Sequence, residues 1–144
     1  MYVIHGDIHS GNCYKVKLLA CQLGIAHRWH HVDILRGETR TPAFLALNPN
    51  GRIPLLERDD GSTLWESNAI LNDLAEGSTL LPAQRRLRAE VLQWQFFEQY
   101  SHEPYIATVR FWTIKQRVHG EDLAAKIADR TPGGYAALGV MEQT

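Results

Sequence analysis

The sequence predicts an α/β domain built on a mixed four-stranded sheet, followed by an incomplete all-α domain. As far as Gly77, short apolar runs alternate with stretches of helical period. Residues 78–82 then carry the small and turn-forming residues of a linker, and beyond them only the helical period recurs. We therefore expect a first domain over residues 1–77, a linker over 78–84 and a partial helical domain over 85–144.

The first domain is expected to alternate strands and helices. Apolar alternation predicts strands, period 3.6 predicts helices, and glycine or Asp-Gly steps end them. In order, the expected elements are a strand at 2–5, a helix ended by Gly24, a strand at 27–34, a short helix opened by Thr41-Pro42, a hairpin of strands 53–57 and 62–65, and a helix at 67–75. This order predicts a mixed sheet with helices packed on it.

The second region reads as helix throughout. Leu87, Val91 and Trp94 follow the helical period from Arg85 onwards. Pro104 should kink or break that helix, because proline lacks a backbone N–H and clashes with the preceding turn. The expected continuations are a helix at 109–118, a helix at 121–129 that Pro132-Gly133-Gly134 ends, and a further helix that begins at 135.

Composition and charge exclude several classes of protein. The net charge of −1 argues against a nucleic-acid or membrane-surface partner. The N-terminus lacks the features of a signal peptide, and no apolar run has the length of a membrane-spanning helix. Cys13 and Cys21 are expected about 12 Å apart along one helix, too far for a disulfide. Reduced thiols without an export signal point to the cytoplasm.

Two blocks of sequence predict a binding site. The turn sequence at residues 48–54 ends in Ile53–Pro54, and we predict this bond to be cis, because the preference for trans is small only before proline. An extended Ile53 outside the sheet would offer its backbone N–H and C=O to a peptide-like ligand. Glu66 and Ser67 stand where a helix begins, and backbone N–H groups with a hydroxyl there form a carboxylate site. The alternative is a plain strand entry and an ordinary helix cap.

Together with Ser10-Gly11-Asn12-Cys13, these blocks resemble the glutathione-binding domain of cytosolic glutathione transferases, in particular the bacterial serine- or cysteine-type proteins. The resemblance is most specific in residues 10–17, 48–56 and 65–74. It implies a thioredoxin-like fold for the first domain, in agreement with the expected order of elements. The residues that it implies for glutathione binding are Arg52, Ile53, Pro54, Glu66 and Ser67.

The resemblance also implies that the catalytic residue lies at the start of the first helix. A hydroxyl there favours a thiolate through a hydrogen bond and the helix dipole. Ser10 is the first candidate, Cys13, which could form a mixed disulfide with glutathione, is the second, and the amide of Asn12 is the third. The alternatives are that Ser10 only caps the helix and that Cys13 is a small buried residue.

The helix that carries Pro104 faces the active site in the resembled family. The resemblance therefore implies that Tyr100, His102, Tyr105 and Arg110 line the co-substrate pocket, with a core or surface position as the alternative for each. No metal is expected: His27 and His31 share one face of a strand and His30 the other, without a cysteine or carboxylate cluster to complete a site.

The implied function is conjugation of glutathione thiolate to small, apolar electrophiles, with glutathione as co-substrate and a second copy of the chain as partner. The alternatives are a glutathione-dependent thiol–disulfide oxidoreductase or peroxidase, and a non-catalytic interaction module of the same fold. In the family the helical domain continues for several helices, one of them opening with Ser/Thr-x-x-Asp. No such tetrad occurs here, so we expect about half of that domain.

Overall fold

The structure is a computed structural model of the 144-residue chain, and it describes residues 1–115 and 120–144. The chain divides into two compact units, Met1–Ala83 and Gln84–Thr144. Each unit is described by itself below.

The first unit is built on a mixed sheet of four strands in the order β2-β1-β3-β4. The strands are β1 (Tyr2–Gly6), β2 (His27–His31), β3 (Leu55–Glu57) and β4 (Thr63–Trp65). β1 pairs in parallel with β2 and antiparallel with β3, and β4 pairs antiparallel with β3. The predicted mixed sheet, and with it the predicted fold class, is confirmed.

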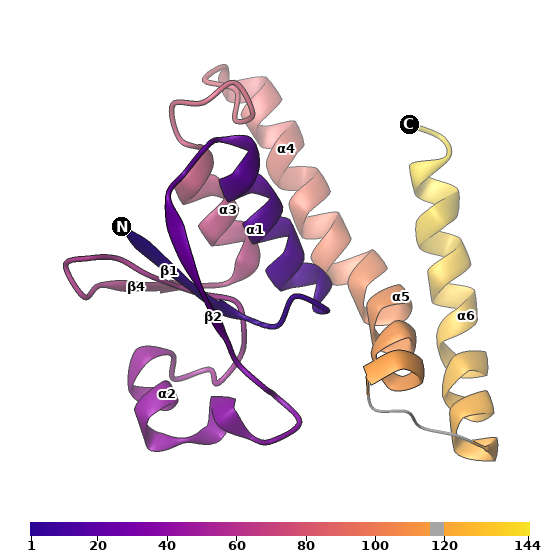
Figure 1. The fold of residues 1–144 in the computed structure, drawn as a ribbon. Helices are drawn as coiled ribbons and strands as arrows, with labels where there is room; N and C mark the ends of the chain where they lie inside the picture. The colour runs from indigo at the N-terminus through magenta and orange to yellow at the C-terminus, as the bar shows by residue number, and fades with distance from the viewer. Residues whose placement is uncertain (116–119) are drawn as a thin grey trace. The chain divides into compact units, whose positions relative to one another are not determined.

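Helices cover both faces of this sheet. Figure 1 shows α1 (Gly11–Gln22) and α3 (Ser67–Ala75) together on one side, and α2 (Pro42–Leu47) on the other. Ile4 and Leu56 are register partners and are fully buried, as is Ile70 of α3. Leu55, one residue before Leu56, belongs instead to a cluster with Val32 and Phe44. Each such side chain stabilises the fold by about 1.5–3 kcal/mol, so the sheet forms a core on both faces.

The second strand is shorter than predicted. It ends at His31 rather than at residue 34. The carboxylate of Asp33 accepts a hydrogen bond from the backbone N–H of Leu35 at 2.9 Å. Such an Asx turn competes with the strand ladder for the backbone groups, and the chain turns there toward the 3-10 segment Glu38–Arg40.

The second unit begins with one long helical run. It comprises α4 (Arg85–Phe97), a π-helical segment (Glu98–His102), α5 (Glu103–Arg110) and a second π-helical segment (Phe111–Lys115). Pro104 lies in the first turn of α5, where its missing N–H breaks no internal hydrogen bond. The helical run continues through Pro104 as a π-helical segment followed by α5, so the predicted break is not found, and a kink at this proline stays a prediction. Residues 116–118 of the predicted helix 109–118 lie outside the described residues.

The predicted break at Pro132-Gly133-Gly134 is wrong. α6 (Glu121–Met141) runs through all three residues and packs against α5 (Figure 1). A Cβ atom at Gly133 would overlap the ring of Tyr105, and one at Gly134 would lie 2.9 Å from Ile106 Cδ1. The two glycines therefore allow a close approach of α5 rather than ending the helix. No helix in residues 1–115 or 120–144 combines the length and the apolar character needed to span a bilayer.

Candidate functional site

One buried amide organises the turn at residues 48–54. Asn48 is 1% exposed. Its Nδ2 donates to the carbonyl of Arg52 at 2.7 Å, and its Oδ1 accepts from the backbone N–H of Asn50 at 3.0 Å. Gly51 completes the turn in the left-handed region, with φ of 61°. Sequence reasoning used Asn48 only as a turn residue, although an asparagine that bonds the backbone two residues on is a known turn pattern.

The Ile53–Pro54 peptide bond is cis, as predicted. Ile53 precedes β3, which begins at Leu55, so the predicted strand 53–57 is two residues too long. The backbone of Ile53 is thus outside the strand pairings of the described sheet, as expected. Its side chain packs beside Leu47 against the core, Pro54 is buried, and Arg52 is exposed.

Glu66 holds an unusual backbone conformation immediately before α3. It has φ of 73° and ψ of 114°, and it is the one non-glycine residue with positive φ in the described part of the chain. Such a conformation costs about 1–3 kcal/mol and is typical of functional sites. The carboxylate of Glu66 accepts a hydrogen bond from Asn50 Nδ2 at 3.3 Å. This contact joins the turn at residues 48–54 to the start of α3.

Ser67 joins the starts of two helices. It is 4% exposed, and its hydroxyl donates to Asn12 Oδ1 at 3.2 Å. The two residues are 55 positions apart in the sequence. Because the oxygen of the Asn12 amide faces Ser67, its NH₂ group is directed to other partners. The structure therefore brings together Asn12, Ser67, Glu66 and Asn50, of which Asn50 was not predicted.

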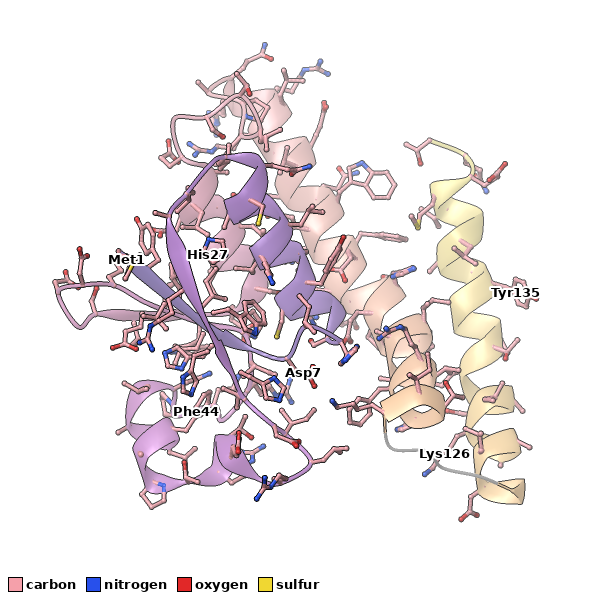
Figure 2. The ribbon with its side chains drawn as sticks, in the orientation of Figure 1. Met1, Asp7, His27, Phe44, Lys126 and Tyr135 are labelled. Carbon is pink, nitrogen blue, oxygen red and sulfur yellow. The ribbon has the colours of Figure 1, made fainter. Side chains whose placement is uncertain are left out.

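Ser10 caps α1. Its hydroxyl oxygen accepts from the backbone N–H of Cys13 at 3.4 Å, which is the plain capping role considered from the sequence. The loop before it is held by the nearly buried Asp7, labelled in Figure 2, whose carbonyl accepts from the N–H of Ser10 at 2.9 Å. Ser10 Oγ accepts the cap hydrogen bond, and the Ser10 hydroxyl also interacts with the Cys13 thiol.

Cys13 lies inside the first unit. Its side chain is fully buried, and a Cβ at Gly6 would lie 2.9 Å from its Sγ. Burial raises the pKa of the Cys13 thiol, and hydrogen bonding by Ser10 offsets this only in part. Cys21, on the same helix, is exposed, and both cysteines are free. The environment of Cys13 therefore disfavours the thiolate that a nucleophile needs.

We expect the two cysteines to differ in reactivity. With iodoacetamide at about pH 8, close to the usual thiol pKa, Cys21 should be alkylated while Cys13 stays protected, because the burial that raises its pKa also blocks the reagent. Mass spectrometry of the Cys21→Ala and Cys13→Ala variants checks this. Rapid alkylation of folded Cys21→Ala would contradict the buried position of Cys13.

The candidates for a co-substrate pocket are spread over the second unit. Tyr100 is 85% exposed and Arg110 is exposed, whereas His102 and Tyr105 are half-buried. Tyr105 lies at the contact between α5 and α6, where its ring faces Gly133. That these four residues line a pocket for an electrophile stays a prediction.

The histidines of the first unit contact neighbouring protein groups. Within the described residues there is no group of three or more histidine, cysteine or acidic side chains placed to hold a metal ion. His27 Nδ1 lies 2.8 Å from the carbonyl of Ile25. The ring of His30 lies 4.8 Å from that of the buried His5 between centroids, with the two planes tilted by 49°, and His5 Nε2 lies 2.8 Å from Glu57 Oε2.

Comparison with known proteins identifies the family. Residues 9–76 match the model of the glutathione S-transferase N-terminal domain, and this range contains the turn, the starts of α1 and α3 and the strands β2, β3 and β4. The chain is similar to the crystal structure of a glutathione S-transferase from Pseudomonas fluorescens, with 56% identity and a TM-score of 0.95 over 99% of this chain and 70% of that one. The chain belongs to the glutathione S-transferase family.

The chain is also similar, at lower identity, to Ure2 proteins. The complex of Ure2p with glutathione is 27% identical, with a TM-score of 0.84 over 99% of this chain and 66% of that one. The transcriptional regulator URE2 of Saccharomyces cerevisiae is 27% identical over 98% of this chain and 42% of that protein. Protein URE2 of Eremothecium gossypii is 32% identical over 73% of this chain, which matches 32% of that protein. The chain thus spans less than half the length of these curated relatives.

Proposed function

We propose that the first unit of this glutathione S-transferase family protein binds glutathione and that the protein conjugates the bound thiolate to small electrophiles. The observation that carries the proposal is the convergence of the Asn12–Ser67 and Asn50–Glu66 hydrogen bonds at the start of α3. These contacts connect the α1 start, the turn at 48–54 and the α3 start, which are the three segments that the sequence singles out.

The ligand is proposed to lie across these segments. The γ-glutamyl carboxylate would accept hydrogen bonds from the Ser67 hydroxyl and from backbone N–H groups at the start of α3, and Glu66 would pair with the ammonium group. The backbone of Ile53 would pair with the cysteinyl unit as a short antiparallel strand. The exposed Arg52 adds positive charge beside an anionic ligand. This arrangement would direct the ligand's sulfur toward the start of α1.

Two groups at the α1 start are proposed to stabilise the thiolate. The Ser10 hydroxyl would exchange its hydrogen bond with the Cys13 thiol for one to the ligand's sulfur, and the Asn12 amide presents its NH₂ end because Ser67 occupies its oxygen. Either donor lowers the pKa of a bound thiol. The sulfur then attacks an electrophilic carbon, a carbon–sulfur bond forms, the leaving group departs with its bonding electrons, and the thiol proton passes to solvent.

Two other functions remain as alternatives. A thiol–disulfide or peroxide-reducing activity needs a reactive thiol, and glutathione itself could supply it, since Cys13 is buried. A non-catalytic role has a precedent in the similar transcriptional regulator URE2. Conjugation is favoured because the similar protein from Pseudomonas fluorescens, 56% identical to this chain, is a glutathione S-transferase.

Retention on immobilised glutathione, followed by turnover of a generic aryl halide with glutathione, tests the proposal. We expect specific elution by free glutathione and a saturable rate above the uncatalysed reaction. Retention without turnover of the halide, a peroxide or a disulfide would favour the non-catalytic role. Absence of retention would reject the glutathione site.

We also propose that the protein works in the cytoplasm.

We further propose that two copies of the chain associate through α4. Leu92, Phe96 and Tyr100 recur at four-residue intervals, and Phe96 and Tyr100 are 70% and 85% exposed. An exposed apolar stripe of this kind is typical of a protein–protein contact.

The variant Phe96→Glu should therefore dissociate the pair, because it places a charge in an apolar contact. In sedimentation velocity we expect a dimer for the unmodified protein and a monomer for the variant. Gln143→Glu adds the same charge at an exposed position beyond α6, away from α4, and it should leave the dimer intact. A monomeric unmodified protein would reject this interface.

A further inference from the structure

The turn at residues 48–54 contains the one Asn-Gly pair of the sequence, Asn50-Gly51. Asparagine is a chemically labile residue, and it deamidates most readily before glycine, because no side chain hinders the approach of the glycine nitrogen to the asparagine Cγ. Asn50 is half-buried, and Gly51 has φ of 61°. The pair therefore combines the sequence that the reaction requires with access to water.

A cation lies beside the peptide bond that carries the attacking nitrogen. Arg40 Nη1 is 3.5 Å from the backbone oxygen of Asn50, and a Cβ at Gly51 would lie 2.6 Å from the same Nη1. The N–H of Gly51 must lose its proton before the nitrogen attacks. A positive charge beside this amide favours the resulting anion, which carries much of its charge on the Asn50 oxygen. The position of Arg40 therefore promotes the reaction.

Two hydrogen bonds hold the reacting groups in the folded turn. Asn50 Nδ2 donates to Glu66 Oε1 at 3.3 Å, and the N–H of Gly51 donates to the carbonyl of Asn48 at 2.9 Å. The bond to Glu66 is exposed to solvent. Water replaces it when it opens, so the opening costs little and lets the carboxamide turn toward Gly51.

We propose that Asn50 is a site of spontaneous deamidation promoted by Arg40, and that the product separates the turn at residues 48–54 from the start of α3. The Gly51 nitrogen gives its proton to solvent and attacks Asn50 Cγ. A carbon–nitrogen bond forms, and the carboxamide nitrogen takes up a proton from water and leaves as ammonia. Water then opens the cyclic imide at one of its two carbonyl groups, which yields aspartate or isoaspartate.

The product replaces a hydrogen bond by a repulsion. A carboxylate at position 50 cannot donate to Glu66, and two negative charges at this distance repel each other. Isoaspartate also lengthens the backbone by one carbon, which disturbs the contacts of Asn48 with Asn50 and Arg52. We expect weaker binding of glutathione as a result. This consequence rests on the glutathione site proposed above, whereas the modification itself does not.

Peptide mapping by mass spectrometry tests the modification on the full chain. During incubation for days in neutral and in mildly alkaline buffer, the peptide that contains Asn50 should gain about 1 Da and split into two chromatographic forms, aspartate and isoaspartate. The reaction should be faster in the alkaline buffer, because the attacking nitrogen must lose a proton. The peptide that contains Asn68, which precedes alanine, is the internal control and should keep its mass.

Two arginine variants test the part that the fold plays. Arg40→Met should slow deamidation of the folded protein about threefold, since it removes one exposed charge beside the amide. Arg36→Met removes the same charge from another exposed position before α2 and should leave the rate unchanged. In concentrated urea all three proteins should react equally fast, because the contact between Arg40 and Asn50 is then lost.

A pair of variants at position 50 tests the consequence. Asn50→Asp reproduces one product, whereas Asn50→Gln keeps an amide that forms an imide only slowly, because the ring would have six members. Asn50→Asp should melt at a lower temperature than Asn50→Gln and bind glutathione about tenfold more weakly. The melting temperature reports the repulsion without a ligand. A protein that does not bind glutathione at all would thus reject the glutathione site and leave the modification to be decided by mass and melting.

Three results would overturn the inference. They are a constant mass of the Asn50 peptide in the folded protein, equal rates for folded Arg40→Met and Arg36→Met, and equal melting temperatures of Asn50→Asp and Asn50→Gln.

Discussion

Replacing Ser67 with alanine should weaken glutathione binding by about 10- to 100-fold. The variant removes a hydroxyl from the proposed carboxylate site, and a hydrogen bond to a charged group contributes about 1.5–3 kcal/mol. It also removes the bond that orients the Asn12 amide, so two parts of the site are lost together. Calorimetric titration with glutathione measures the effect directly.

Ser62→Ala is the matched control for this experiment. It removes a hydroxyl from the hairpin of the same unit, where Ser62 accepts a bond from Arg58 at 3.4 Å. We expect its affinity for glutathione to equal that of the unmodified protein. Equal affinities of Ser67→Ala and Ser62→Ala would show that the start of α3 does not hold the ligand.

Replacing Ser10 with alanine should raise the pKa of bound glutathione and slow conjugation by about one to two decades. The estimate is the loss of one hydrogen bond to a thiolate, about 1.5–3 kcal/mol. The thiolate absorbance of the bound ligand, followed against pH, reports its pKa, and turnover of the aryl halide reports the rate. A raised pKa means that the rate falls most at neutral pH and recovers as the pH rises.

Three further variants separate catalysis from helix capping. Ser10→Ala also removes the N-cap of α1, which is worth about 1 kcal/mol of stability. Ser10→Thr keeps both the cap and the hydroxyl, so it should restore most of the rate. Asn12→Ala measures the second donor, and Cys13→Ala should cost less than either. If Ser10→Ala conjugates at the rate of the unmodified protein and Cys13→Ala is much slower, the order of the candidates is reversed.

The parts of the fold that depend on neighbouring residues could be predicted from the sequence. The turn before Pro54 and the start of α3 at Ser67 follow from the turn and capping preferences of the residues in them. Gly24 follows α1 with φ of 64°, the left-handed conformation in which glycine commonly ends a helix.

The parts of the fold that depend on contacts between distant residues could not be predicted from the sequence. Nothing local indicates that Asn50 would bond Glu66, or that Ser67 would bond Asn12, because these pairs meet only when the sheet has formed. The glycines at 133 and 134 look like helix breakers in the sequence. In the structure they permit the packing of Tyr105 and Ile106 against α6, and tertiary contacts outweigh their low helix propensity.

A crystal structure of the protein with glutathione bound tests the proposed site most directly. We expect the γ-glutamyl carboxylate on the Ser67 hydroxyl and the start of α3, the cysteinyl unit paired with the backbone of Ile53, and the sulfur within hydrogen-bond distance of Ser10 Oγ or Asn12 Nδ2. Glutathione bound elsewhere, or bound here with its sulfur turned away from the start of α1, would contradict the proposed function.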